Sequence, residues 1–336
     1  MSNTMRDVIL FLVLALSAGA AEPCMEASSR CAERLPVGTR GSHLLVYRTH
    51  PLTSVNPAVR RAMIIVHGAT RNADHYFATG VAAAVLAGAQ SDAIVVSPRF
   101  AVNNGRTSKD PLSEGEISWE SKIGWAGGGE AQGQPDLSTY DGMDALLRSL
   151  ANRQNFPNLA SIVVSGHSAG GQFTSRYAGL NQVHESLGVP VRYVVANPST
   201  MLYLDDLRPA RDGQGGFRPY ADRENCTTFD DYKFGLQKRT GYAARLTAEK
   251  IRSQLAARPV TYLAGELDTL PIAGFDSSCP AMAQGPDRFS RAKSYFAHVT
   301  QRHNAKHEFV PVPLCGHNNR CIWTADVALP VLFPKP

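Results

Sequence analysis

Short apolar runs alternate with helix-like stretches through most of this chain, and that alternation constrains the fold most strongly. Turn residues bound the apolar runs, which lie at residues 62–66, 93–96, 161–164, 192–195, 260–263 and 308–312, with a strand-like piece at 43–47 before them. Stretches that favour a helix lie between several runs, at 81–86, 141–151, 171–178 and 243–255. Continuous apolar strands separated by helices are typical of a mostly parallel sheet that helices cover on both faces. The pattern therefore predicts an α/β fold.

Two long segments interrupt the alternation, and we interpret them as lid or insertion segments of one domain that spans residues 21–336. Residues 101–139 are rich in glycine and serine, whereas residues 199–240 are polar and aromatic. Loops of this length inside a compact domain are usually lids or binding loops. We expect Trp119 and Trp125, in the first segment, to line a substrate pocket. The alternative is that these two large side chains belong to the core.

Residues 1–20 have the pattern of a cleavable secretory signal peptide. Arg6 precedes an apolar run at 8–16, and small residues follow at 17–21. The run is too short to span a bilayer comfortably, and no later segment is long and apolar enough to do so. An uncleaved membrane anchor is the alternative. We predict a secreted or periplasmic protein without stable membrane insertion.

The six cysteines fit such a compartment, because disulfides persist where thiols are not kept reduced. Short loops favour the first and last pairs in chain order and leave the middle pair: Cys24–Cys31, Cys315–Cys321 and Cys226–Cys279. Sequence alone does not fix this pairing, and free buried thiols are the alternative for some of the six. None has the C-x-x-C spacing of a metal site.

The chain carries a net charge of +5, but its lysines and arginines are scattered along the sequence. A surface that binds nucleic acid needs a dense basic patch, so we do not expect a nucleic-acid partner. No feature of the sequence indicates an oligomeric state. We therefore expect the main partner to be a substrate, and the reactive residues indicate its chemical class.

The stretch Gly166–Gly170, with the sequence GHSAG, has the form of a nucleophile elbow. An elbow needs a strand that leads into the turn and a helix that leaves it. The apolar run at 161–164 and the helix-like stretch at 171–178 supply both. The two glycines leave room for a turn in which a Cβ atom would clash. We therefore predict that Ser168 is a nucleophile; an ordinary glycine-rich turn is the alternative.

A serine hydroxyl needs a base to take its proton, and a histidine usually serves. In folds with such an elbow the histidine follows the serine, which leaves five candidates: His184, His298, His303, His307 and His317. We favour His317, because it lies just past the last apolar run, where the carboxyl ends of strands carry function. A surface-loop histidine is the alternative. His303 and His307 are four residues apart but lack the glutamate of an H-E-x-x-H zinc helix.

An acid is expected at the end of the preceding strand, in the stretch YLAGELDTLP. We favour Asp268, because a carboxylate at that loop position can accept a hydrogen bond from a histidine Nδ1 and fix the tautomer of the ring. The weaker candidates are Glu266, Asp276, Asp205 and Asp206. For Asp268 the alternative is an aspartate that caps a helix or a turn.

Two backbone N–H groups are expected to stabilise the oxyanion of the transition state. One belongs to Ala169, which follows the nucleophile. The other belongs to the loop after an early strand, where Ala69 follows His67 and Gly68, and Thr70 is the second candidate. A simple β-turn is the alternative for this loop.

These motifs resemble those of the α/β-hydrolase superfamily over roughly residues 60–325. The residues that carry the likeness are His67-Gly68, Gly166–Gly170, Asp268 and Gly316-His317. The resemblance implies an eight-stranded, mostly parallel sheet and ester hydrolysis through an acyl-enzyme. The stretches YLAGELDT, AQGPDRFSRA and PLCGH are similar to secreted esterase- or lipase-like members, which implies no particular substrate. His67-Gly68-Ala69 departs from the HGGG loop of the hormone-sensitive-lipase pattern and so argues against that subfamily.

We therefore expect a secreted serine hydrolase that cleaves carboxylic esters, small or polymeric, with Ser168, His317 and Asp268 as its triad. This chemistry needs no metal and no organic cofactor. One alternative is an amide or peptide hydrolase that uses the same residues. The other is a catalytically silent hydrolase fold that serves as a binding module.

Overall fold

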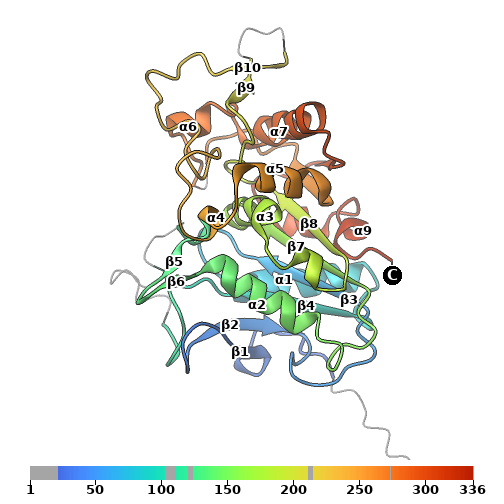
Figure 1. Ribbon diagram of the computed structural model, residues 1–336. Helices are drawn as coiled ribbons and strands as arrows, with labels where there is room; N and C mark the ends of the chain where they lie inside the picture. The colour runs from blue at the N-terminus through green and yellow to red at the C-terminus, as the bar shows by residue number, and fades with distance from the viewer. Residues whose placement is uncertain (1–21, 103–110, 120–123, 211–214, 273, 336) are drawn as a thin grey trace, which may run out of the picture.

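The main strands form one eight-stranded sheet in the order β1-β2-β4-β3-β7-β8-β11-β12 (Figure 1). This computed structural model describes residues 22–102, 111–119, 124–210, 215–272 and 274–335. The strands are β1 (Ala32–Pro36), β2 (His43–Arg48), β3 (Arg61–Val66), β4 (Ala93–Pro98), β7 (Ser161–His167), β8 (Val191–Ala196), β11 (Val260–Gly265) and β12 (Glu308–Val312). From β4 to β12 all neighbours are parallel, whereas β1 and β2 are antiparallel additions at one edge. The predicted mostly parallel, eight-stranded sheet is confirmed.

The longer helices are α1 (Ala73–Leu86), α2 (Thr139–Leu150), α3 (Ala169–Leu180), α5 (Ala248–Ala257) and α7 (Arg288–His303). Shorter ones are α4 (Gly241–Ala244), α6 (Cys279–Met282), α8 (Asn319–Thr324) and α9 (Leu329–Leu332), with 3-10 turns η1 (Ser29–Cys31), η2 (Gly124–Gly127) and η3 (His184–Ser186). The prediction of one helix over 243–255 is wrong, because two helices share this stretch. Thr247 starts the second one: its side chain accepts a hydrogen bond from the Lys250 N–H.

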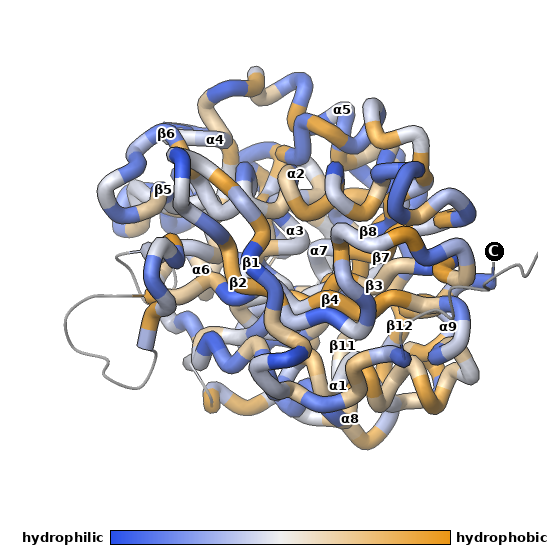
Figure 2. Tube along the Cα trace, turned by 90° about the horizontal axis from the view of Figure 1, so that it is seen from below, coloured by the Kyte–Doolittle hydropathy of each residue, from blue (hydrophilic) through white to orange (hydrophobic). Residues whose placement is uncertain are grey.

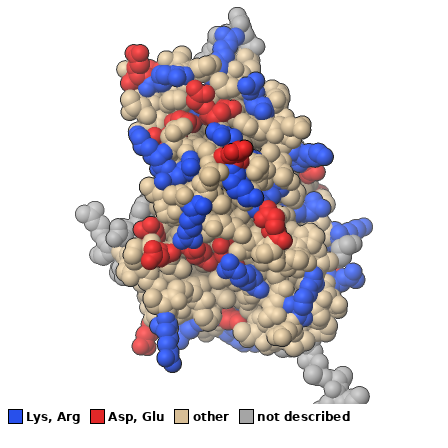
Figure 3. Space-filling model, viewed as in Figure 1, with Lys and Arg blue, Asp and Glu red and all other residues tan. Residues whose placement is uncertain are grey.

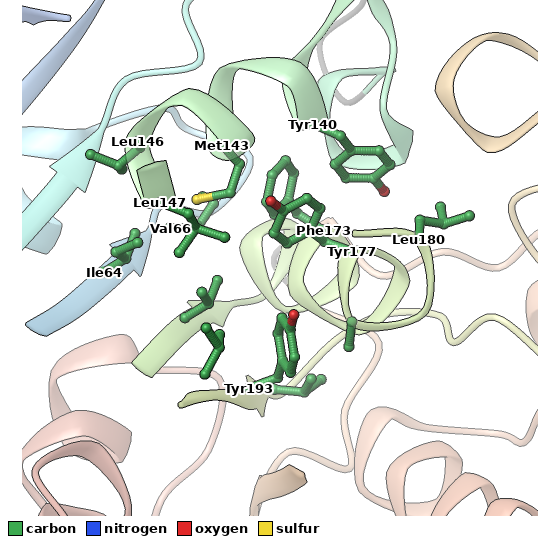
Figure 4. Packing of buried hydrophobic residues seen from close by; sticks show 14 of the residues in the cluster. Ile64, Val66, Tyr140, Met143, Leu146, Leu147, Phe173, Tyr177, Leu180 and Tyr193 are labelled. Atoms are coloured by element: carbon green, nitrogen blue, oxygen red, sulfur yellow. The ribbon is translucent and has the colours of Figure 1, made fainter. Parts of the chain in front are cut away.

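The core lies on both faces of the sheet, which explains why the strands are continuously apolar. Ile64 and Val66 of β3 join one buried cluster, whereas Met63 and Ile65 join the other. Successive side chains of a strand point to opposite faces, so one strand feeds both clusters. Helices α2 and α3 complete the first cluster (Figure 4), and α1 and α8 complete the second. Apolar residues dominate the central strands in Figure 2 as well.

The two predicted insertions contain short regular pieces. Within the first lie β5 (Glu130–Ala131) and β6 (Gln134–Ser138), which pair antiparallel. Within the second lie β9 (Leu207–Pro209) and β10 (Phe217–Pro219), also antiparallel. The strands β9 and β10 and the helices α6 and α7 lie together at one end of the molecule (Figure 1). The structure joins the six cysteines in three disulfides, Cys24–Cys31, Cys226–Cys279 and Cys315–Cys321, and the second of these ties the second insertion to α6.

The described surface carries charges of both signs. Figure 3 shows lysine and arginine side chains interspersed with aspartate and glutamate across one face, without a dense basic patch on that face. In the described part of the chain, no helix combines the length and apolar character needed to cross a membrane. Residues 1–20, which the sequence predicts to be a signal peptide, lie outside the described residues.

Candidate active site

Ser168 lies at the sharp turn between β7 and α3. Its φ of +60° is a backbone conformation that side chains other than glycine rarely adopt, and it is typical of strained functional turns. A Cβ atom on Gly166 would overlap the carbonyl of Gly170, and one on Gly170 would overlap the carbonyl of Val66. The turn therefore requires both glycines, and it holds Ser168 at the carboxyl ends of the central strands.

The structure brings Ser168, His317 and Asp268 together. His317 Nε2 lies 3.0 Å from Ser168 Oγ, although 149 positions separate the two residues. His317 Nδ1 lies 2.7 Å from Asp268 Oδ2, a distance at which Nδ1–H donates to the carboxylate. That tautomer leaves the Nε2 lone pair to accept the serine proton. The side chains of His317 and Asp268 are 5% and 1% exposed, which shields their contact from water.

Two loops carry the acid and the histidine to Ser168. They follow β11 and β12, which are parallel neighbours, so both loops leave the same edge of the sheet. The Leu267 N–H donates to the Cys315 carbonyl at 2.9 Å, and a Cβ on Gly265 would overlap that same carbonyl. The Cys315–Cys321 disulfide closes the turn that contains His317. The two loops are therefore held against each other next to the Asp268–His317 hydrogen bond.

Two residues to which the sequence analysis assigns no role support this arrangement. Arg288, the first residue of α7, contacts Asp268 Oδ1 at 3.4 Å, and both side chains are buried. Asn197, just after β8, donates to the Gly316 carbonyl at 3.0 Å and accepts from the Gly265 N–H at 2.9 Å. Its position at the carboxyl end of a strand was a signal that could have identified Asn197. No such signal marks Arg288, because an arginine in a helix is usually exposed.

The candidate oxyanion donors lie beside Ser168. Ala169 is the first residue of α3, where a backbone N–H has no acceptor inside the helix and where the helix dipole adds partial positive charge. Ala69 lines the same cavity as Ser168. A Cβ on the preceding Gly68 would lie 3.6 Å from the Ser168 Cβ, so the two turns are close neighbours. Ala69 and Ala169 therefore both lie near Ser168, as the prediction of two oxyanion donors requires.

Two buried histidines, His67 and His167, directly precede Gly68 and Ser168 in the chain. His67 Nε2 accepts from the Phe100 N–H at 2.9 Å, and its Nδ1–H donates to the Gly68 carbonyl at 2.9 Å. Burial lowers the pKa of His67 to about 4, so the ring keeps the neutral form that makes both bonds. Burial and the neighbouring His317 lower the pKa of His167 well below its usual value. His167 therefore stays neutral beside His317, with ring centroids 4.7 Å apart.

A cavity of about 1010 Å³ opens at Ser168 and His317. Its described wall includes the polar and charged residues Thr70, Arg71, Asn72, Asp74, His75, Arg99, Asn318 and Asn319. Trp119 and Trp125 are not among the described residues that line this cavity; both are buried and border a separate cavity of about 600 Å³. The Trp125 ring packs against His67 and Phe100, so these tryptophans support the site from the core.

The other candidate bases and acids lie elsewhere. His184 Nδ1 contacts the Tyr193 hydroxyl at 2.9 Å, and His307 Nδ1 contacts the Tyr262 hydroxyl at 2.9 Å. His298 and His303 lie beside Asp205, Asp206 is paired with Arg223 at 3.6 Å, and the backbone N–H of Asp276 is bonded to Ser199. Glu266 is exposed. Of the candidate histidine–acid pairs, the one formed by His317 and Asp268 is the pair that the structure places in contact with Ser168.

The comparisons with known proteins agree with this fold. The model of the alpha/beta hydrolase family matches residues 63–328. A poly(aspartic acid) hydrolase from Sphingomonas sp. KT-1 has a similar structure, with 21% identity, a TM-score of 0.58, and coverage of 87% of this chain and 95% of that one. A poly(3-hydroxybutyrate) depolymerase from Bordetella parapertussis is also similar, with 22% identity and a TM-score of 0.56. That match covers 86% of this chain and 84% of the depolymerase. The comparison with curated proteins gave no match. The family match covers most of the chain, and this protein therefore belongs to the alpha/beta hydrolase family.

Proposed function

We propose that this chain is a secreted serine hydrolase that cleaves carboxylic esters with Ser168, His317 and Asp268. The observation that carries the proposal is the continuous line of contacts from Ser168 Oγ through His317 to Asp268, with separations of 3.0 and 2.7 Å. A serine, a histidine and an aspartate in this geometry form a nucleophile, a base and the acid that orients the base. Membership of the alpha/beta hydrolase family supports the same chemistry.

In the proposed reaction, Ser168 Oγ attacks the ester carbonyl carbon while His317 Nε2 takes the hydroxyl proton. Asp268 stabilises the imidazolium and holds its orientation. The N–H groups of Ala69 and Ala169 bind the oxyanion, each contributing roughly 2.7–4 kcal/mol. His317 then delivers the proton to the leaving alcohol, and a water molecule activated by the same histidine releases the acid and restores Ser168.

Export is the second part of the proposal. Three disulfides need an oxidising compartment, and residues 1–20 have the composition of a cleaved signal. The mature chain would begin near Ala21 and fold as one domain. Mass spectrometry of the protein recovered from the medium or periplasm tests this, and an intact first segment in the recovered protein argues against cleavage.

The reaction is tested with the mature protein and its Ser168→Ala variant, assayed on p-nitrophenyl esters of increasing acyl length. The cavity of about 1010 Å³ leaves room for long chains, so the series also locates the preferred size. Poly(3-hydroxybutyrate), the polymer named for one structural neighbour, extends the series to a polymeric ester. Hydrolysis that disappears in Ser168→Ala supports the proposal.

Two further comparisons separate this function from its alternatives. Matched p-nitroanilides distinguish an ester hydrolase from an amide hydrolase, and faster cleavage of the anilides would overturn ester specificity. A fluorophosphonate probe reports a nucleophilic serine without any assumption about the substrate. If the wild-type protein neither cleaves an ester nor reacts with the probe, the chain is a binding module rather than an enzyme.

A further inference from the structure

Away from Ser168, the side chains of Asp205, His298 and His303 converge. Asp205 follows β8 and precedes β9, whereas both histidines lie in the C-terminal part of α7, at the end of the molecule that Figure 1 shows uppermost. Asp205 Oδ2 lies 3.1 Å from His303 Nε2, and Asp205 Oδ1 lies 3.5 Å from His298 Nε2. One ligand atom of each residue lies within 4.8 Å of the other two.

These separations fit the coordination shell of a small divalent ion. Zinc binds imidazole nitrogens and carboxylate oxygens at about 2.0–2.2 Å, so two ligands of a tetrahedral zinc ion lie about 3.3 Å apart. The observed 3.1 and 3.5 Å, one from each carboxylate oxygen of Asp205, lie on either side of that value. Two imidazoles and one carboxylate are also a donor set that transition-metal ions prefer to calcium or magnesium ions.

His298 provides the second, independent observation. Its side chain is fully buried, yet neither ring nitrogen makes a hydrogen bond to any described residue. The ring packs against Tyr203 and Phe217, with centroids 4.7 and 5.1 Å away. Buried polar atoms are almost always partnered, so an unpartnered imidazole nitrogen aimed at a carboxylate requires an explanation. The hydrogen bond between Asp205 and His303 accounts for those two residues but not for His298.

The surroundings are compatible with a bound cation. Arg208 and Arg302 bring positive charge near His298, but the Arg208 guanidinium is engaged by the Asp230 carboxylate at 3.1 Å and lies over the Tyr203 ring. The Leu207 N–H donates to Asp205 Oδ1 at 2.9 Å, an outer contact of the kind that orients metal-binding carboxylates. The side chains of Asp205 and His303 are 25% and 15% exposed, so an ion can reach the cluster from solvent.

We propose that Asp205, His298 and His303 bind one divalent transition-metal ion, with zinc as the preferred ion. Three protein ligands leave the fourth tetrahedral position to a water molecule. Since the ligands come from the segment after β8 and from α7, the ion fastens these two parts of the chain together. The site is separate from Ser168, and its existence does not depend on the proposed hydrolase activity.

The test uses the untagged mature protein, stripped with a chelator and titrated with Zn²⁺ by calorimetry, while Tm is followed in parallel. We expect one ion per chain, micromolar or tighter affinity, and a higher Tm with zinc, because a ligand that binds only the folded state stabilises it. Co²⁺ in place of Zn²⁺ is expected to give the visible absorption of a tetrahedral ion. Wild-type protein that binds no Zn²⁺ in this range overturns the proposal without any variant.

Variants then assign the ligands. His298→Phe keeps a ring among Tyr203 and Phe217 and is expected to fold, whereas His303→Ala removes a partly exposed ligand. Each should weaken binding by more than the roughly 10–100-fold that loss of an outer-shell partner causes. The matched control is His75→Ala, because His75 is an exposed histidine beside Asp74, and it should leave Kd unchanged. Stoichiometric binding that survives both ligand substitutions would place the zinc elsewhere.

Discussion

Two of the histidine–aspartate contacts among the described residues, one at Asp268 and one at Asp205, differ in what surrounds the imidazole. His317 has a partner on each ring nitrogen, Asp268 on one side and Ser168 on the other. His298 is buried just as deeply but makes no hydrogen bond to any described residue, although Asp205 lies 3.5 Å away. The first arrangement suits the proposed proton transfer from Ser168 to His317. The second arrangement brings ligand atoms of Asp205, His298 and His303 close together, which suits a bound metal ion better than a proton relay.

His67 shows that burial alone does not produce an unpartnered imidazole. It is completely buried, yet the Phe100 N–H and the Gly68 carbonyl satisfy both of its ring nitrogens. The neutral tautomer has one donor and one acceptor, and the backbone supplies the complement of each. His167 has a partner on Nδ1, the Tyr76 hydroxyl, but none on Nε2. Of these three buried histidines, His298 is the one with no described hydrogen-bond partner on either ring nitrogen.

The largest expected effect on activity comes from Asp268, and the matching change at Asp205 should affect zinc binding instead. Asp268→Asn should lower kcat for ester hydrolysis by about 10⁴-fold, because an amide in place of the carboxylate favours the wrong tautomer of His317. The same variant should still bind zinc. Asp205→Asn should lose the zinc-induced rise in Tm. Parallel kinetics and calorimetry on both variants check this, and a variant that loses both properties would show that the two sites are not independent.

Removing disulfides is a second way to distinguish the Ser168 site from the cluster at Asp205. Cys226–Cys279 closes a loop with a sequence separation of 53, so replacing both cysteines by serine should cost about 4 kcal/mol of unfolding free energy. Cys315–Cys321 spans only 6 positions, and its removal should cost about 2 kcal/mol. Urea unfolding measures both.

The short disulfide should have the larger effect on catalysis, because its loop carries His317. We expect a lower kcat without the Cys315–Cys321 bond, whereas loss of Cys226–Cys279 should loosen the end of the molecule that contains Asp205. Equal effects of the two removals on kcat would contradict the idea that the bridges act locally.

Sequence patterns were sufficient for the parts of the molecule that depend on local rules. The strands are continuously apolar because both faces of the sheet are buried, and the glycines beside Ser168 are required because a Cβ would strike backbone atoms. Asp268 was preferred to Glu266 only because of its position in the loop. The structure brings together two loops that are distant in sequence, and it places Asp268 beside His317.

The features that the sequence does not predict depend on packing between segments that are distant along the chain. Arg288 supports Asp268 from a helix that begins twenty residues later, and nothing local distinguishes it from an exposed arginine. His303 and His307 were considered together and rejected as a zinc helix. The structure instead places His303 beside His298, five positions earlier in α7. Trp119 is buried beside a cavity other than the one at Ser168, and the sequence does not show which cavity a loop residue borders.

A pH titration sharpens the contrast between partnered and unpartnered histidines. The pKa of His67 is lowered to about 4 in the folded chain, against about 6.5 when unfolded. Between these values the unfolded chain binds the extra proton, so stability falls as pH decreases from 6.5 towards 4 and is retained above 6.5. At pH 5 the contribution lost is about 2 kcal/mol.

The matching variant is His67→Asn, which keeps a buried donor and acceptor but cannot titrate. We expect its free energy of unfolding to be lower at pH 7, because the Phe100 N–H loses part of its hydrogen bond. Its further loss between pH 7 and pH 5 should be about 2 kcal/mol smaller than that of the wild type. Urea unfolding at the two pH values measures the difference, and equal losses would mean that His67 is not the titrating group.

The smallest expected change in stability comes from Gly142→Ala. This substitution tests whether a more stable fold by itself alters either site. A Cβ at Gly142, in the interior of α2, meets only Leu44 at 3.6 Å, an ordinary contact. Alanine in a helix interior is favoured over glycine, so this substitution should raise the free energy of unfolding by about 0.5–1 kcal/mol. Combined with His303→Ala it should raise Tm without restoring zinc binding, because a more stable scaffold does not replace a missing ligand. Recovery of zinc affinity in the double variant would instead mean that His303→Ala acted by loosening the fold.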